Sequence, residues 1–212
     1  GSIATSGSID TCTNDAAITV SASSAADTPT NGSLYYRVAG IVTYTNVPMA
    51  NCENKAGGDI TVSGNIIAGR KDNQAGVGVS GVATYYAKSS GSTTDTTNRG
   101  DINFNASVSM HSEIASNATY GKINISGVIG YVTGTMSNLK NYGNINIGSD
   151  AGATTIIGNG IHIAGITSLQ SKAITTAVNE GNINVHSNVT FDNGITTDAD
   201  SALSNTCINS SI

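Results

Sequence analysis

Three short stretches decide the fold: NRGDINF at residues 98–104, NYGNINI at 141–147 and NEGNINV at 179–185. Two looser copies, NDAAITV at 14–20 and NKAGGDITV at 54–62, precede them. The first isoleucine of the copies recurs at spacings of 42, 42, 43 and 38 residues, at Ile18, Ile60, Ile102, Ile145 and Ile183. A nearly fixed period of this length is typical of repeat architectures, in which each unit buries its apolar face on its neighbours.

A second block lies between these copies and centres on a glycine: VAGIV, VSGVA, ISGVI and IAGIT, with Gly40, Gly81, Gly127 and Gly165. Four residues after each glycine stand Tyr44, Tyr85, Tyr131 and Leu169. The shared register predicts a column of stacked rings.

The apolar residues inside each block alternate with polar ones, as in Ile102 and Phe104. This is strand periodicity, and the abundant Thr, Ser, Gly and Asn are poor helix formers. Parallel crossovers are almost always right-handed. The sequence therefore predicts an all-β fold: a single right-handed parallel β-helix (β-solenoid) over residues 1–212, with about five coils, a period near 42 residues and variable loops.

Equivalent residues of a solenoid form columns, so the asparagine that opens each block predicts an amide ladder at a corner: Asn14, Asn54, Asn98, Asn141 and Asn179. Asparagine tolerates the left-handed conformation of sharp corners. We expect the glycine two residues later to supply a positive φ there, at Gly100, Gly143 and Gly181.

Composition excludes several classes of function. Charged residues are 11% of the chain, with 9 Lys plus Arg and a net charge of −5, so nucleic-acid phosphate has no basic surface to bind. No apolar stretch approaches the roughly 20 residues of a membrane span. With 2 Phe and no Trp, the core must be thin.

The cysteines and histidines predict neither a metal site nor a cofactor site. Cys12, Cys52 and Cys207 each lie two residues before an Asn, in a slot that holds Thr96, Leu139 and Ala177 in other copies. We interpret them as small apolar residues, the alternative being a Cys12–Cys52 disulfide.

TCIN at 206–209 repeats TCTN at 11–14, which predicts the start of a further block and a chain cut from a longer protein.

No histidine is predicted to be catalytic, because the three fall at different offsets in the repeats: His111, His162 and His186. His162 alternates with Ile161 and Ile163 and should face outward. Asp59 and Asp101 share a slot in successive copies and carry the enzyme alternative, a lyase or hydrolase of acidic glycans. Lys55 and Arg99 are the candidate basic partners.

An ice-binding array of Thr43 and Thr84 is a weaker alternative, since the slot continues as Gly130 and Ser168.

Residues 127–147, GVIGYVTGTMSNLKNYGNINI, resemble the GLUG repeat of bacterial surface proteins. The matching positions are Gly127, Gly130, Tyr131, Gly134, Asn138, Asn141, Gly143 and Asn144. A looser similarity extends over roughly residues 37–185. The resemblance implies an extracellular repetitive segment, often of an adhesin or of a large surface enzyme whose chemistry lies elsewhere, and it brings no catalytic residues.

Binding, if any, is expected on the polar stretches between the blocks: 63–76, 86–97, 105–121, 148–160 and 186–199. The predicted function is a non-catalytic, adhesin-like module on the bacterial cell surface, which displays loops for a host glycan or protein or spaces other domains. Six Asn-x-Ser/Thr sequons, at Asn31, Asn105, Asn117, Asn124, Asn188 and Asn209, are expected to stay unglycosylated.

Overall fold

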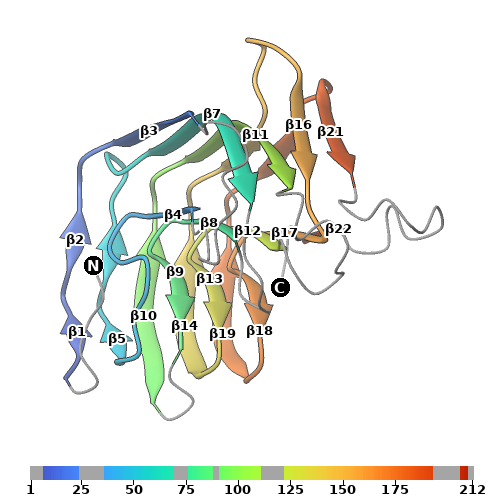
Figure 1. The fold of residues 1–212 in the computed structure, drawn as a ribbon. Helices are drawn as coiled ribbons and strands as arrows, with labels where there is room; N and C mark the ends of the chain where they lie inside the picture. Colours follow the sequence, from blue (N-terminus) through green and yellow to red (C-terminus); the bar gives the residue numbers. More distant parts are fainter. Residues whose placement is uncertain are drawn as a thin grey trace.

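The fold is all-β and is built from ladders of parallel strands (Figure 1). The computed structural model describes residues 7–23, 36–68, 76–87, 91–110, 122–192 and 206–209. Every regular element in those ranges is a strand, and each strand pairs with its equivalent one repeat away. Parallel stacking of this kind is consistent with a β-solenoid.

Four sheets run along the stack. The first contains β1 (Ile9–Asp10), β2 (Thr13–Asn14), β5 (Met49–Ala50), β6 (Glu53–Asn54), β10 (Ser92–Asn98), β14 (Thr135–Asn141) and β19 (Ile174–Asn179). The second contains β3 (Ile18–Ser23), β7 (Ile60–Ala68), β11 (Ile102–Met110), β15 (Ile145–Ile147), β16 (Thr154–Ile157), β20 (Ile183–Val185) and β21 (Val189–Asp192). The third contains β4 (Tyr36–Ala39), β8 (Val77–Ser80), β12 (Lys122–Ser126), β17 (Gly160–Ala164) and β22 (Thr206–Asn209), and the fourth contains β9 (Ala83–Tyr86), β13 (Ile129–Val132) and β18 (Thr167–Gln170).

The isoleucine column confirms the predicted register. Strand pairing joins Ile18 to Ile60, Ile60 to Ile102, Ile102 to Ile145 and Ile145 to Ile183. The three inner members are fully buried, whereas Ile18 and Ile183 are half-buried because they lie in the outermost described strands of the ladder. Ile183 is therefore less enclosed than Ile60, Ile102 and Ile145.

The asparagine ladder is also confirmed. Each Nδ2 donates to the Oδ1 of the next member at 2.8–2.9 Å, from Asn14 through Asn54, Asn98 and Asn141 to Asn179. The same Nδ2 donates to a main-chain carbonyl of its own corner, such as Gly100 for Asn98 and Gly143 for Asn141. Both amide protons are thus used, and the inner three members are fully buried.

The prediction of a positive φ at Gly100, Gly143 and Gly181 is wrong. None of the three has one, and each is required for space instead: a Cβ on Gly143 would lie 2.0 Å from the carbonyl oxygen of Gly100. The left-handed conformation lies three residues before each ladder asparagine, in a column of exposed or half-buried bends: Thr11, Asn51, Asp95, Asn138 and Thr176.

The glycines of the second block pack directly against the asparagine ladder. A Cβ on Gly127 would lie 2.0 Å from the Gly165 oxygen and 2.4 Å from Cγ of Asn141, and Gly40, Gly81 and Gly165 meet Asn54, Asn98 and Asn179 in the same way. This contact crosses the interior between two hydrophobic clusters, one between the second and third sheets and one between the first and fourth.

The tyrosine column forms as predicted. The rings of Tyr44 and Tyr85 stack with centroids 5.2 Å apart, and Tyr85 lies 5.0 Å from the tilted ring of Tyr131. Leu169 is paired with Tyr131 in the next strand.

Two sequence predictions need correction. Thr206–Asn209 does not begin a new Asn block, because β22 pairs with β17 and places Ile208 beside Ile163 of the glycine block. The segments predicted as loops are also partly strand. β7 extends to Ala68, β11 extends to Met110, β10 begins at Ser92, and β16 and β21 fall inside two of the predicted loops.

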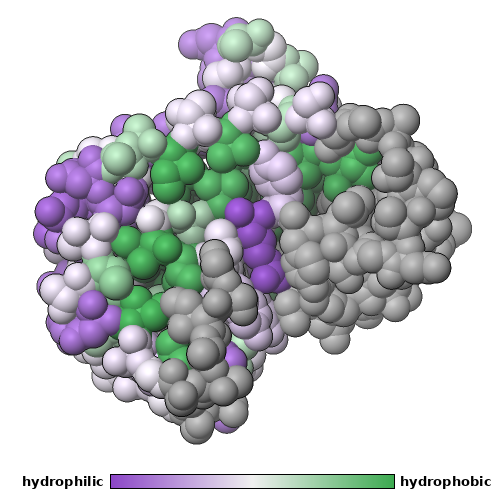
Figure 2. Space-filling view, turned by 60° about the vertical axis from the view of Figure 1, so that its left-hand side comes forward, coloured by the Kyte–Doolittle hydropathy of each residue, from purple (hydrophilic) through white to green (hydrophobic). Residues whose placement is uncertain are grey.

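The strands nearest the N-terminus lie at one end of the stack, on the left of Figure 1, and this side is turned toward the reader in Figure 2, where hydrophobic side chains gather in the middle of the surface. A hollow of about 390 Å³ at this end is lined by Val20, Tyr36, Arg37, Val38, Ala39 and Thr43.

Candidate functional site

Each of the two aspartates of the enzyme alternative accepts a hydrogen bond from the main chain. Asp59 Oδ1 accepts the main-chain N–H of Asp101 at 2.8 Å, and Asp101 Oδ1 accepts that of Asn144 at 2.7 Å. Asn144 Oδ1 in turn accepts the N–H of Asn182 at 3.1 Å. The carboxylates and amides of this column therefore do the same structural task, which explains why Asp and Asn interchange there.

The candidate basic partners point elsewhere. Arg99 Nε bonds Glu53 Oε1 at 2.6 Å, and its guanidinium lies 4.5 Å from the centre of the Tyr142 ring. Lys55 lies 3.9 Å from Asp15. Within the described ranges, neither cation forms an ion pair with Asp59 or Asp101.

The cysteine slot is apolar, as expected. Cys52 is fully buried in the hydrophobic cluster between the first and fourth sheets, and Cys12 packs against the same cluster. Both are free thiols, so the disulfide alternative does not hold in this structure. Burial is the main cause that raises the pKa of Cys52. Cys207 lies in β22, away from that slot.

His162 lies on the outer side of β17, as predicted, but it is half-buried. Its Nδ1 lies 3.1 Å from Asn124 Oδ1. Burial, followed by the positive charge of Lys122, lowers the pKa of His162 below its usual value, which favours the neutral ring. His111 lies outside the described residues.

The candidate threonine array is not a free surface. Thr84 is almost fully buried and its hydroxyl donates to the Thr43 carbonyl, while Ser168 donates to the Gly130 carbonyl at 2.6 Å.

A polar groove of about 350 Å³ lies on the outer face of the second sheet, and it is the strongest candidate site. Its lining comes from β7, β11 and the segment that joins β15 to β16: Ser63, Gly64, Asn65, Asn105, Ser107, Ser149, Ala151, Gly152, Ala153 and Thr154. The volume falls at the lower end of the range of ligand pockets. None of these lining side chains carries a charge.

The groove exists because β11 changes partner. Its residues 102–104 pair with β15, and Val108 pairs with Ile156 of β16. Between these pairings the chain at 148–153 leaves the sheet and forms a wall, starting at Gly148, where φ is +78°. The outward side chains of β7 and β11 form the floor.

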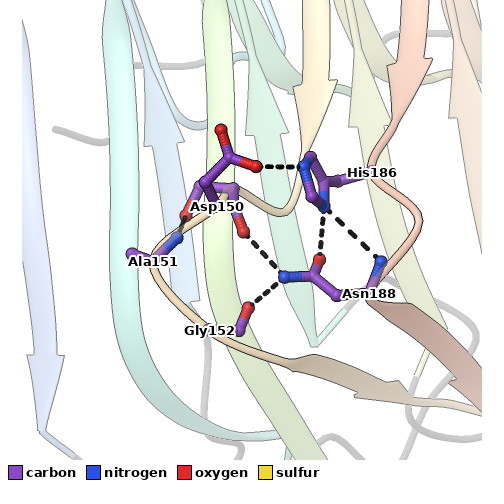
Figure 3. Close-up of polar contacts among 6 residues, drawn as sticks. Asp150, Ala151, Gly152, His186 and Asn188 are labelled. Atoms are coloured by element: carbon purple, nitrogen blue, oxygen red, sulfur yellow. Dashed lines mark hydrogen bonds and ion pairs between the residues drawn. The ribbon is translucent and has the colours of Figure 1, made fainter.

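Hydrogen bonds from the next repeat hold the wall in place (Figure 3). Asn188 Nδ2 donates to the carbonyls of Ser149 at 2.8 Å and Gly152 at 2.6 Å. His186 holds Asn188 through its Nδ1, 2.8 Å from Asn188 Oδ1, and its Nε2 lies 2.7 Å from Asp150 Oδ1. The Asp150 side chain is 98% exposed, so its contact with His186 stabilises the wall less than the Asn188 amide does.

The amides on the groove floor differ from the other asparagines of the sheet. Asn103, Asn146 and Asn184 form a second ladder on the outer face, at 2.8 and 2.9 Å. By contrast, Ser63, Asn65 and Asn105 have no side-chain hydrogen bond to any residue that the structure describes. Their donors and acceptors are available to a ligand.

The sequence predicted the stretches that carry this groove but not the residues that hold its wall. The groove residues fall within the stretches expected to carry binding, but His186 was considered only as a catalytic candidate and Asn188 only as a sequon. Their contacts join residues more than 30 positions apart with no shared motif, so no local signal pointed to them.

Comparison with known proteins gave no match to a family model, to a curated protein or to a solved structure. Over the ranges that the structure describes, no cluster of three or more His, Cys, Asp or Glu is placed to hold a metal ion. Those ranges also contain no helix of the length and hydrophobicity needed to cross a membrane.

Proposed function

We propose that this chain is a non-catalytic, adhesin-like repeat module of a bacterial cell surface. In this proposal it is a right-handed solenoid of about five coils related to the GLUG repeats, and it presents its outer face to a host glycan or protein. One observation carries the proposal. The polar side chains that recur at fixed positions of the repeat, in the asparagine ladder and in the column of Asp59 and Asp101, already make hydrogen bonds within the protein.

The groove supports a binding function over a purely spacing one. At the groove the outer face departs from the regular repeat and leaves polar side chains without partners among the described residues. A spacer needs no such departure.

Binding and turnover should be measured on the same protein. We expect the purified chain to bind immobilised host glycans or matrix proteins, and to release no reducing ends or unsaturated products from pectate, alginate or heparan sulfate. Turnover that is abolished by Asp101→Asn would establish the enzyme alternative. An antibody against the chain should bind to the surface of intact native cells, which tests the location. An experimental structure tests the handedness and the number of coils.

A further inference from the structure

We infer that the groove between the β7–β11 floor and the 148–153 wall binds an uncharged saccharide. The inference rests on the proposed function, since it names the ligand class of that binding module. It depends on four observations: the arrangement of the floor, its polar groups without hydrogen bonds, the absence of charge among the described lining residues, and the hydrogen bonds that hold the wall.

The floor presents two rows, each with one hydroxyl and one amide. Strand pairing places Ser63 beside Asn105 and Asn65 beside Ser107. Paired positions on adjacent strands lie about 4.8 Å apart, and successive outward positions along one strand about 6.6 Å apart. An amide offers two donors and an acceptor, and a hydroxyl offers one donor and two acceptors. A ligand with several neighbouring hydroxyls satisfies such a surface.

The backbone that carries the floor is already held in place. Ser63 and Asn105 are half-buried on strands paired over nine residues, and Ser107 Oγ accepts the main-chain N–H of Thr155 at 3.2 Å. The floor strands therefore need no ordering when a ligand binds, which reduces the entropic cost of association.

Charge separates neutral from acidic saccharides. No lysine or arginine is among the described residues that line the groove, and Asp150, which is not one of those lining residues, bonds His186. A uronate or sulfate ligand would lose hydration without gaining a cation, and the net charge of −5 repels it. The lining thus favours neutral sugars over acidic glycans.

Two other ligand classes fit less well. The apolar side chains among the described lining residues are the small ones of Ala151 and Ala153, so a hydrophobic ligand would bury little area against them. An extended peptide binds proteins by adding to an unpaired strand edge. The groove instead lies on the face of β7 and β11, and the other edge of β11 lacks a strand partner at residues 105–107, between β15 and β16, which is too short a stretch for an extended peptide to pair with.

The test is a binding experiment with defined probes. Di- to tetrasaccharides of mannose, galactose and glucose serve as neutral probes, with oligogalacturonate and heparin fragments as acidic ones. Binding is screened on an array and then measured by calorimetry. Asn105→Leu and Asn65→Leu keep side-chain size and remove the amide, and Asn184→Ala removes an exposed amide of the same sheet outside the groove.

We expect at least one neutral probe to bind, with affinity reduced about tenfold or more by each groove variant and unchanged in Asn184→Ala. Thermal melts of all three variants check that they are folded. Binding of a neutral probe that is equal in all variants would place the site elsewhere and leave the proposed module function intact. Binding of acidic probes alone, or of no probe, would overturn the saccharide class assigned here. Cleavage of a probe would overturn the non-catalytic function instead.

Discussion

At the scale of single residues, glycine and asparagine form the central contact of this protein. The carbonyl oxygens and amides that surround Gly127 leave no room for a side chain. We predict that Gly127→Ala destabilises the fold by about 3 kcal/mol, because overpacked interiors must move their neighbours. Gly160→Ala is the matched control, since its Cβ would lie 3.3 Å from His162 Cε1, a contact that a side chain can relieve. Urea denaturation of both variants measures the difference, and equal losses would contradict the packing described.

A second residue-scale prediction concerns acid stability. The pKa of His162 is lowered in the folded protein, first by burial and then by Lys122. As the pH falls through the ordinary value of about 6.5, the unfolded chain takes up this proton while the folded ring stays neutral, so stability falls. The loss levels off once the folded ring is also protonated.

The variant His162→Gln retains a polar side chain beside Asn124 and removes the titration. We expect the free energy of unfolding of the wild type to decrease more than that of His162→Gln between pH 7.5 and pH 5, measured by urea denaturation. Parallel pH profiles for the two proteins would show that His162 has the same pKa in the folded and unfolded states.

At this scale the sequence predicted which residues form each column better than it predicted why those residues are needed there. The ladder asparagines, the tyrosines and the isoleucines could be read from spacing alone, because one residue type repeats in one slot. The reason for Gly100 and Gly143 could not be, since a need for space and a need for positive φ both select glycine. Only the packing of one repeat on the next distinguishes these two causes.

At the scale of elements, the 148–153 wall depends on a tie from the following repeat. We predict that Asn188→Ala loosens the wall and so speeds the exchange of its main-chain amide protons with solvent. The reason is that the carbonyls of Ser149 and Gly152 lose the amide donor that they share. Asp150→Ala removes only a solvent-exposed partner of His186 and should change the wall little. Hydrogen exchange of a peptide spanning 148–153 measures both, with faster exchange expected for Asn188→Ala alone. The prediction fails if the two variants exchange at the same rate.

The strand β11 beside this wall was not fully predicted from the sequence. Polar stretches between blocks were expected to be loops, yet β11 continues through Asn105 to Met110 and buries Ala106 and Val108. Small and polar residues alternate there as they do in the regular strands, but the apolar members are smaller, so the pattern is weak. The groove arises from the change of partner from β15 to β16, which depends on three-dimensional pairing.

At the scale of the whole molecule, stability depends on the register that all ladders share. We predict that Ile145→Asp, which places a carboxylate in the fully buried isoleucine column, destabilises the fold by about 4 kcal/mol or more. Asn105→Asp introduces the same side chain on the outer face and should cost about 0.5 kcal/mol or less. Melting temperatures of the two variants decide the matter: similar values would mean that Ile145 does not face the interior.

The contact between the glycine column and the asparagine ladder also bears on how such a gene can change its length. In each repeat the glycine and the asparagine that it touches are separated by only a short stretch of chain, as with Gly127 and Asn141. A duplication that copies this stretch copies both partners of the contact together. Unequal recombination can therefore add or delete one period without a compensating mutation elsewhere.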